Sequence, residues 1–254
     1  KMEHLDAATL EEFMAYHKTY YGPNNAVLIV AGDIDTEETI ELVKKYFDEV
    51  PRGNEVVRNF PKEEPISENV RAIAYDRNIQ IPMLLSSFRT PGFASRDSYV
   101  LDMISTYLSS GKSSVLYKKL VDNQKQALQT QVINLGQVDY NIFAILALPL
   151  GDVSLDTLLT EIEEEIEKVQ NELISERDHQ KLLNKFESQF VNSNSSIAGI
   201  ANSLARYYLL YGDVNLINKE IDIYRSISRE EIRSVAQKYL SPNQRVDIEY
   251  LPGE

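Results

Sequence analysis

Two segments of this chain repeat one another at a single offset, and this duplication restricts the folds that the chain can adopt. The first runs from Thr9 to Ile29 and the second from Ser228 to Ile248, with Pro242 lying 219 positions after Pro23 (242 − 23). Each segment predicts a helix, a turn and a strand, because Ser/Thr-x-x-Glu starts helices, Pro-Asn ends them and β-branched runs favour strands. The residues that coincide are Thr9 and Ser228, Glu12 and Glu231, Phe13 and Ile232, Tyr20 and Tyr239, Asn24 and Asn243, Val27 and Val246, and Ile29 and Ile248.

The positions of the two copies indicate how much of a duplicated protein is present. The second copy closes a segment of domain length, whereas only eight residues precede the capping sequence of the first copy, and the chain starts at Lys1 rather than at a methionine. We therefore expect a fragment that holds the tail of one repeat at residues 1–50 and the whole of the next at residues 70–254. Most of the first repeat is then expected to be missing.

Residues 51–69 are predicted to link these two parts. Prolines and charged residues dominate the segment, and apolar residues are few. Proline favours an extended backbone, so the connector is predicted to be stiff rather than floppy.

The order of the predicted elements favours an α+β fold. In the tail, helices are predicted over residues 9–21 and from residue 36, with a buried strand at residues 26–31 between them. After the linker, strands precede helices and one strand closes the chain, so we expect an antiparallel sheet flanked by helices, with the last strand returning to the sheet that residues 70–76 begin. The strands are predicted at residues 70–76, 83–90, 127–135, 140–148 and 245–251, and the helices at residues 96–108, 113–123, 154–173, 176–190, 197–211, 213–226 and 228–239.

Composition excludes several classes of function. With 26 basic and 39 acidic residues the net charge is −13, which argues against nucleic acid and against an anionic membrane surface as partners. The chain has no cysteine, so disulfides, thiol catalysis and cysteine-bound zinc are excluded. The longest apolar run, residues 142–150, is too short to span a bilayer. The compartment stays open, with the cytoplasm or a bacterial periplasm as the choices.

No motif in the chain identifies a reaction. Residues 110–114 contain the Gly-Lys-Ser of a phosphate-binding loop, but Thr106 stands where that loop needs glycine and a helix is predicted where it needs a strand. The segment is interpreted as a break between helices, and a phosphate-binding domain is kept as an alternative that nucleotide titration would settle. Residues 161–167 carry five glutamates, which are interpreted as a solvated helix face rather than a surface for a basic partner.

The three histidines, His4, His17 and His179, do not have the spacing of a zinc site. His17 is expected to pack on the apolar side of its helix and His179 to be solvated. We therefore expect no catalytic residue and no metal ligand in this chain, and the sequence leaves the substrate-binding residues unknown.

The repeat itself resembles the insulinase/pitrilysin type of zinc metallopeptidase, a family that includes the mitochondrial processing peptidases. The resemblance rests on Tyr-Tyr-x-Pro-x-Asn-Ala-Val-Leu at residues 20–28 and on Leu-Ser-Ser-Gly-Lys-Ser-Ser-x-Leu-Tyr-x-x-Leu at residues 108–120. Residues 30–35, 42–47, 209–213 and 239–242 also fit, so that the resemblance covers nearly the whole chain.

The resemblance implies two homologous α+β domains that together form half of a clam-shell around an unfolded peptide. It places the zinc site, His-x-x-Glu-His with a downstream glutamate, in the front part of the first domain, which this chain lacks. Zinc is therefore expected in the missing part of the parent, and no cofactor is expected in this chain.

The resemblance also implies a substrate-contacting arginine just after residue 120, followed by a tyrosine seven positions later. Val121 and Leu128 stand at those positions, and neither side chain can donate a hydrogen bond to an oxyanion. The parent would take this element from a partner chain or do without it, or this half serves only to shape the chamber.

The expected function is therefore that of the non-catalytic C-terminal portion of a zinc metalloendopeptidase, which forms part of the peptide-enclosing chamber. The alternative is a domain of a protease-inactive binding or assembly subunit of the same family. Whether His-x-x-Glu-His precedes Lys1 in the parent separates the two. The expected partners are a peptide or unfolded protein, the missing first domain, and a second family subunit in a homo- or heterodimer.

Overall fold

The computed structural model describes residues 2–57 and 59–253. The chain divides by its internal contacts into two compact units, residues 1–63 with 192–217 and residues 64–191 with 218–254. The boundary between the two units at residues 63 and 64 lies inside the predicted linker. The described residues between 48 and 69 contain no helix or strand. Residues 192–217 group with the first unit, although the sequence placed them in the C-terminal domain. Assignment of residues 1–50 to a separate family domain stays a prediction.

The first unit is helical. Its elements are α1 (Met2–Asp6), α2 (Leu10–Tyr20), the 3₁₀ turn η1 (Pro23–Asn25), α3 (Thr36–Phe47), α7 (Ile197–Tyr211) and most of the turn η3 (Val214–Asn218). The predicted capping box is present, since the Thr9 amide donates to Glu12 Oε2 (2.8 Å) and Thr9 Oγ1 accepts from the Glu12 amide (3.3 Å).

The strand predicted at residues 26–31 is not formed, so this prediction is wrong for the structure of this chain. A strand is defined by the ladder that it makes with a neighbour. No strand of the described residues pairs with this segment. The residues keep their β-branched sequence without a sheet to join.

The second unit is built on a five-stranded sheet in the order β1-β5-β2-β4-β3. The strands are β1 (Val70–Asp76), β2 (Met83–Pro91), β3 (Ala127–Leu135), β4 (Tyr140–Pro149) and β5 (Arg245–Pro252). All neighbours are antiparallel except β1 and β5, which run parallel with Val70 opposite Val246. The predicted return of the closing strand to the sheet is therefore confirmed, and the structure places β5 between β1 and β2 rather than at an edge.

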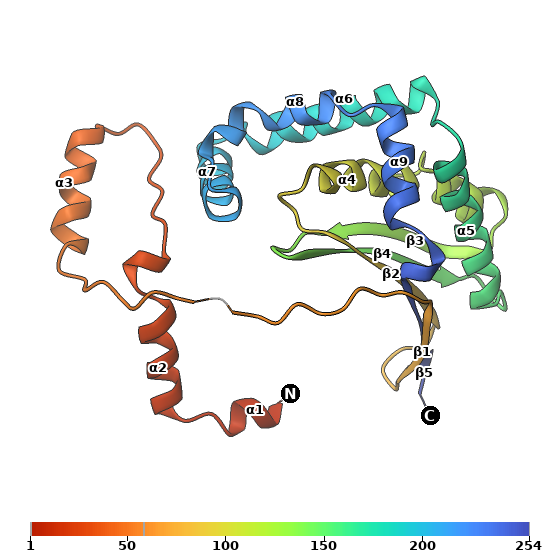
Figure 1. The fold of residues 1–254 in the computed structure, drawn as a ribbon, viewed down its shortest axis with the longest axis horizontal. Coiled ribbons are helices and arrows are strands. Elements are labelled where there is room, and N and C mark those ends of the chain that lie inside the picture. Colours follow the sequence, from red (N-terminus) through yellow and green to blue (C-terminus); the bar gives the residue numbers. More distant parts are fainter. Residues whose placement is uncertain (1, 58, 254) are drawn as a thin grey trace. The chain divides into compact units, whose positions relative to one another are not determined.

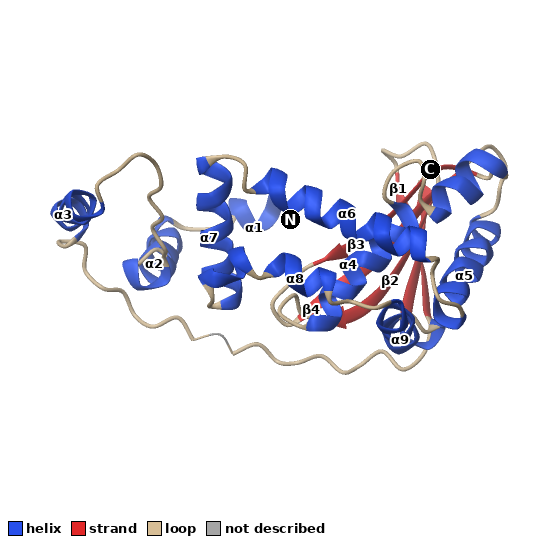
Figure 2. Cartoon of the chain, turned by 90° about the horizontal axis from the view of Figure 1, so that it is seen from above, coloured by secondary structure: helices blue, strands red, loops and turns tan. Residues whose placement is uncertain are grey.

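Helices of this unit lie over one face of the sheet (Figure 1 and Figure 2). They are α4 (Arg96–Ser109), the π-helical segment η2 (Tyr117–Asn123), α5 (Leu155–Asn171), α6 (Glu176–Ser193, whose last two residues group with the first unit), α8 (Glu220–Arg225) and α9 (Arg229–Tyr239), followed by the turn η4 (Pro242–Gln244). The single helix predicted over residues 213–226 is divided into η3 and α8. The Asp213 carboxylate accepts from the backbone and side chain of Asn215, a local turn that competes with helix.

The core lies between the sheet and α4, α5 and α9. Alternate residues of the central strands point into it, and Phe88 and Phe143, which are paired across β2 and β4, meet edge to face with ring centroids 6.3 Å apart. From the helices, Leu101, Ile162 and Ile232 are almost completely buried. Burial of an apolar side chain of this size contributes about 1.5–3 kcal/mol, so this face of the sheet is the main source of stability.

The opposite face of the sheet carries none of the helices of its own unit (Figure 1). Its residues are the strand positions that alternate with the core. Most of them are apolar and half-buried or exposed, whereas Arg89 and Gln131 are polar and Ala144 is buried. They include Val70, Leu85, Ile133, Ile142, Leu146, Val246 and Ile248. We call these residues the open sheet face.

Candidate functional site

The described residues do not gather a metal site. No group of three histidine, aspartate or glutamate side chains in residues 2–57 and 59–253 is placed to hold a metal ion, so these residues do not fit zinc. Among the same residues, no helix combines the length and apolar character needed to cross a membrane.

The histidines depart from their predicted surroundings. His17 was expected to be packed, but it is exposed and stacks on Tyr21, with ring centroids 5.1 Å apart. None of the residues of its helix, α2, is buried. His179 was expected to be solvated, but it is half-buried and its Nε2 lies 2.8 Å from the carbonyl oxygen of Ile227.

The loop at residues 109–114 connects α4 to η2, as the interpretation of a break between helices requires. Its backbone is held in place, because Ser109 Oγ accepts from the Val132 amide (2.6 Å) and Ser114 Oγ donates to the carbonyl of Gly111 (2.7 Å). Gly111 has φ +82°, a left-handed conformation that glycine adopts without strain. Helix α4, rather than a strand, leads directly into this loop, so the loop lacks the setting of a nucleotide-binding loop.

The glutamates of α5 are not the solvated face that was predicted. Lys119 on η2 reaches three of them, lying 2.8 Å from Glu161, 2.7 Å from Glu164 and 3.1 Å from Glu165. The hydrogen bond from Lys119 is the main cause that lowers the pKa of Glu161. The acidic run therefore holds η2 against α5, a tertiary contact that a helical charge pattern does not reveal.

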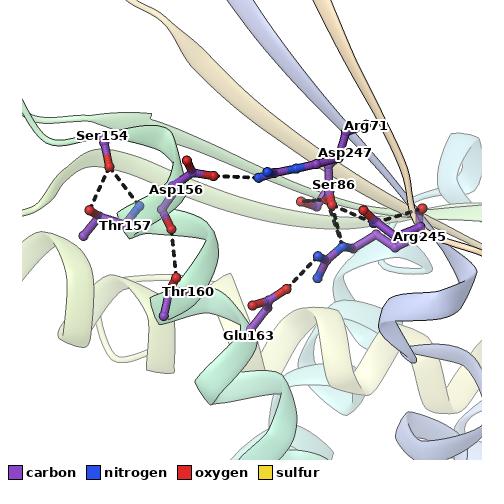
Figure 3. Close-up of polar contacts among 10 residues, drawn as sticks. Arg71, Ser86, Ser154, Asp156, Thr157, Thr160, Glu163, Arg245 and Asp247 are labelled. Atoms are coloured by element: carbon purple, nitrogen blue, oxygen red, sulfur yellow. Dashed lines mark hydrogen bonds and ion pairs between the residues drawn. The ribbon is translucent and has the colours of Figure 1, made fainter.

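A buried polar network lies where β5 meets α5 (Figure 3). The Asp247 carboxylate, with 1% of its side chain exposed, lies 2.9 Å from Arg245 Nε and accepts from Ser86 Oγ (2.6 Å). Asn69 Nδ2, at the end of the linker, donates to the same carboxylate (2.8 Å). Arg245 Nη2 continues to Glu163 of α5 (2.6 Å). The network joins the end of the linker, β5, β2 and α5, so we interpret it as structural.

A second ion pair lies at the surface beside this network. Arg71 Nη2 is 2.6 Å from Asp156 Oδ1, and half or more of each side chain is exposed. Figure 3 shows it extending from β1 to the first turn of α5.

The two positions where the family resemblance implies an arginine and a tyrosine lie on different elements. Val121 is in η2 and Leu128 is in β3, and both side chains are apolar. Residues 64–191 and 218–254 thus present a packed scaffold with a largely apolar open sheet face.

Known proteins with similar sequences are zinc proteases and a processing peptidase subunit. The "Zinc protease PqqE" of Helicobacter pylori is 26% identical over 249 residues, which are 97% of this chain and 56% of the relative. A protein of Arabidopsis thaliana described as "Probable mitochondrial-processing peptidase subunit beta" is 24% identical over 249 residues, covering 94% of this chain and 46% of that protein. This chain thus spans about half the length of these relatives.

Solved structures share the fold. A protease from Helicobacter pylori superposes with a TM-score of 0.90 at 24% identity, covering 98% of this chain and 61% of that chain. A peptidase M16 inactive domain from Pseudomonas fluorescens superposes with a TM-score of 0.82 at 14% identity over 98% of this chain and 58% of the other.

A family model settles the relationship. The model described as the peptidase M16 inactive domain matches residues 7–186, which is more than half of the chain. With the five-stranded sheet, the one-sided helix layer and the zinc-protease relatives, this match confirms the family that the repeated turn indicated. The chain belongs to the peptidase M16 family and carries its inactive domain.

Proposed function

We propose that this chain is the non-catalytic part of a longer zinc metalloendopeptidase, in which it forms part of the wall of a chamber that encloses peptides or unfolded proteins. The zinc ligands and the catalytic base would come from a preceding domain. Relatives named zinc proteases are about twice the length of this chain, which supports this division of roles. A second family subunit would complete the chamber in a homo- or heterodimer.

One observation carries the proposal, namely that the two copies of the repeat are buried to very different extents. Ile232 on α9 is 1% exposed, whereas Phe13, its counterpart on α2, is 57% exposed. The next position of the same face differs in the same way, since Val235 is 5% exposed and Tyr16 is 59% exposed. Two similar helices therefore have their apolar faces in opposite surroundings.

This asymmetry points to a partner for residues 9–31. Most of the stability of an amphipathic helix in a protein comes from packing its apolar face, and a helix of this length is marginal alone in water. In the second copy, the helix covers a sheet and the following strand lies inside that sheet. Because the first copy of the repeat corresponds to the second, α2 would cover a sheet of the preceding domain and residues 26–31 would form a strand of that sheet.

The open sheet face supports the same proposal. Large apolar patches on a folded surface mark sites of contact with other chains, domains or ligands. In a peptide-enclosing enzyme this face would either meet another part of the shell or line its wall.

Peptide hydrolysis tests the proposal. We expect this chain alone to leave an unstructured peptide intact, and the longer protein with its preceding domain to cleave it in a reaction that a metal chelator stops. Removing residues 70–254 from the longer protein should abolish that cleavage, because the chamber would lose a wall.

Two results would contradict the proposal. Chelator-sensitive cleavage by this chain alone would assign it a metal site of its own. A longer protein that has no His-x-x-Glu-His sequence and cleaves nothing would instead favour the protease-inactive assembly subunit.

A further inference from the structure

We infer that α6 and the loop at residues 109–114 form a binding site for the carboxylate groups of acidic peptides. Lys185 Nζ donates a hydrogen bond to Ser110 Oγ, and Lys181 Nζ donates to the carbonyl oxygen of Ser113 (3.2 Å). The two lysines are four positions apart, so they lie on the same face of α6. Two ammonium groups therefore converge on one short loop.

These two lysines have no carboxylate partner among residues 2–57 and 59–253. Several other cations of the same unit do, including Lys119, Lys168, Lys238 and Arg245. The contrast is informative because acidic residues outnumber basic ones by 39 to 26 in this chain. The Ser110 hydroxyl and the Ser113 carbonyl each accept one hydrogen bond from a lysine, but these neutral oxygens leave the positive charge of the two lysines uncompensated.

The surroundings of Lys185 favour an added negative charge. Burial lowers the pKa of this lysine, and the neighbouring charge of Lys181 lowers it further. Both effects disfavour the charged ammonium, and a nearby anion would offset both. Lys112 is exposed in the same loop and has no ion pair with the described residues, so it adds a third positive charge.

The loop is held ready for a ligand. Ser109 is tied to β3 through its hydrogen bond with the Val132 amide, and the Ser114 side chain and backbone both donate to the carbonyl of Gly111. A site whose backbone is already fixed loses less conformational entropy when it binds.

The loop lacks the features of a nucleotide-binding loop, so a nucleotide fits this site poorly. Nucleotide-binding loops follow a strand and use a second glycine, whereas this loop follows α4 and has threonine at position 106. Two or three lysines acting as point charges suit a single carboxylate without a metal ion. The choice of peptide as its carrier rests on the proposed function, and either an acidic side chain or a C-terminus could supply the group.

Calorimetric titration of the whole 254-residue chain tests the site. The probes are an acidic peptide with a free C-terminus, the same peptide amidated, and a version with asparagine and glutamine in place of the acidic residues. We expect the acidic peptide to bind, and Lys185→Gln or Lys181→Gln to weaken it about tenfold, since hydrogen bonds to charged groups are the stronger class. Added salt should weaken binding further.

The amidated and neutralised peptides distinguish the two sources of carboxylate. Loss of binding with amidation assigns the site to the C-terminus, and loss with the neutralised peptide assigns it to side chains. If a peptide that is both amidated and neutralised still binds, the inference is wrong.

Control variants separate binding from folding. Lys62→Gln removes the same charge from an exposed linker lysine and should leave the affinity unchanged. Lys185→Arg should retain most of the affinity. Equal binding by the Lys181→Gln/Lys185→Gln double variant would overturn the inference, as would a nucleotide or inorganic phosphate that binds as well as the acidic peptide. Because no catalysis is measured, failure here leaves the hydrolysis test of the longer protein unaffected.

Discussion

Replacing Asp247 with alanine is expected to lower the free energy of unfolding of the sheet unit by about 3–5 kcal/mol, the range for breaking a buried ion pair. The carboxylate is almost fully buried and accepts hydrogen bonds from Arg245, Ser86 and Asn69. Without it, Arg245 keeps Glu163 as its charged partner among the described residues, Ser86 loses its acceptor, and Asn69 keeps the longer hydrogen bond to the carbonyl of Arg245 (3.3 Å). Urea unfolding followed by circular dichroism measures the change.

The surface ion pair beside this network is the control. Asp156→Ala removes the partner of Arg71, but both side chains are at least half exposed, so solvent screens the interaction. Asp156 also interacts favourably with the N-terminus of α5, because it lies in the first turn of that helix. Even with both contributions removed, the free energy of unfolding should fall by no more than about 1 kcal/mol. Similar losses in the two variants would contradict the assignment of Asp247 as the centre of a buried network.

The second large change in stability is expected at Ile232, which corresponds to Phe13 in the first copy of the repeat. Ile232→Ala should destabilise the chain by about 2–5 kcal/mol, because it leaves a cavity between α9 and the core. Phe13→Ala removes a larger side chain from the equivalent position of α2. It should change the stability of this chain by less than about 0.5 kcal/mol, as is usual for an exposed site.

The same unfolding measurement compares the two variants. A cost for Phe13→Ala close to that of Ile232→Ala would mean that α2 is already packed within this chain, contrary to its 57% exposed phenylalanine. Leu10→Ala changes another exposed position of α2, and it should lower the free energy of unfolding as little as Phe13→Ala does.

The sequence predicted most elements because their signals are local. Thr9 in the first unit and Ser154 and Ser228 in the second each cap the helix that was expected after them. The alternating strands at residues 83–90 and 140–148 form within one residue of their predicted ends. Turn and capping chemistry acts over a few residues, so it can be recognised without the fold.

The sequence failed where a side chain depends on a distant neighbour. In β5 the charged side chains Arg245 and Asp247 are buried, and residues of other elements pair with them. Glu163 of α5 pairs with Arg245, and Ser86 of β2 donates to Asp247. No local pattern in residues 245–251 reveals these partners. Lys119 changes the environment of the α5 glutamates in the same way.

The absent strand at residues 26–31 is a failure of another kind. Its β-branched sequence is suited to a sheet, but strand pairing is a property of two segments, and no described strand of this chain pairs with it. The same reason explains why α2 exposes its apolar face.

Amide hydrogen exchange of α2 tests most directly whether residues 9–31 belong to a domain outside this chain. Exchange would be measured in this chain and in the longer protein with its preceding domain, with α9 as the internal standard. Local stability ranges from near zero for unpacked segments to the global value in a core. We predict that α2 exchanges much faster than α9 in this chain and becomes protected to a similar degree in the longer protein. Equal protection of α2 in the two proteins would contradict the proposal that the first copy of the repeat completes another domain.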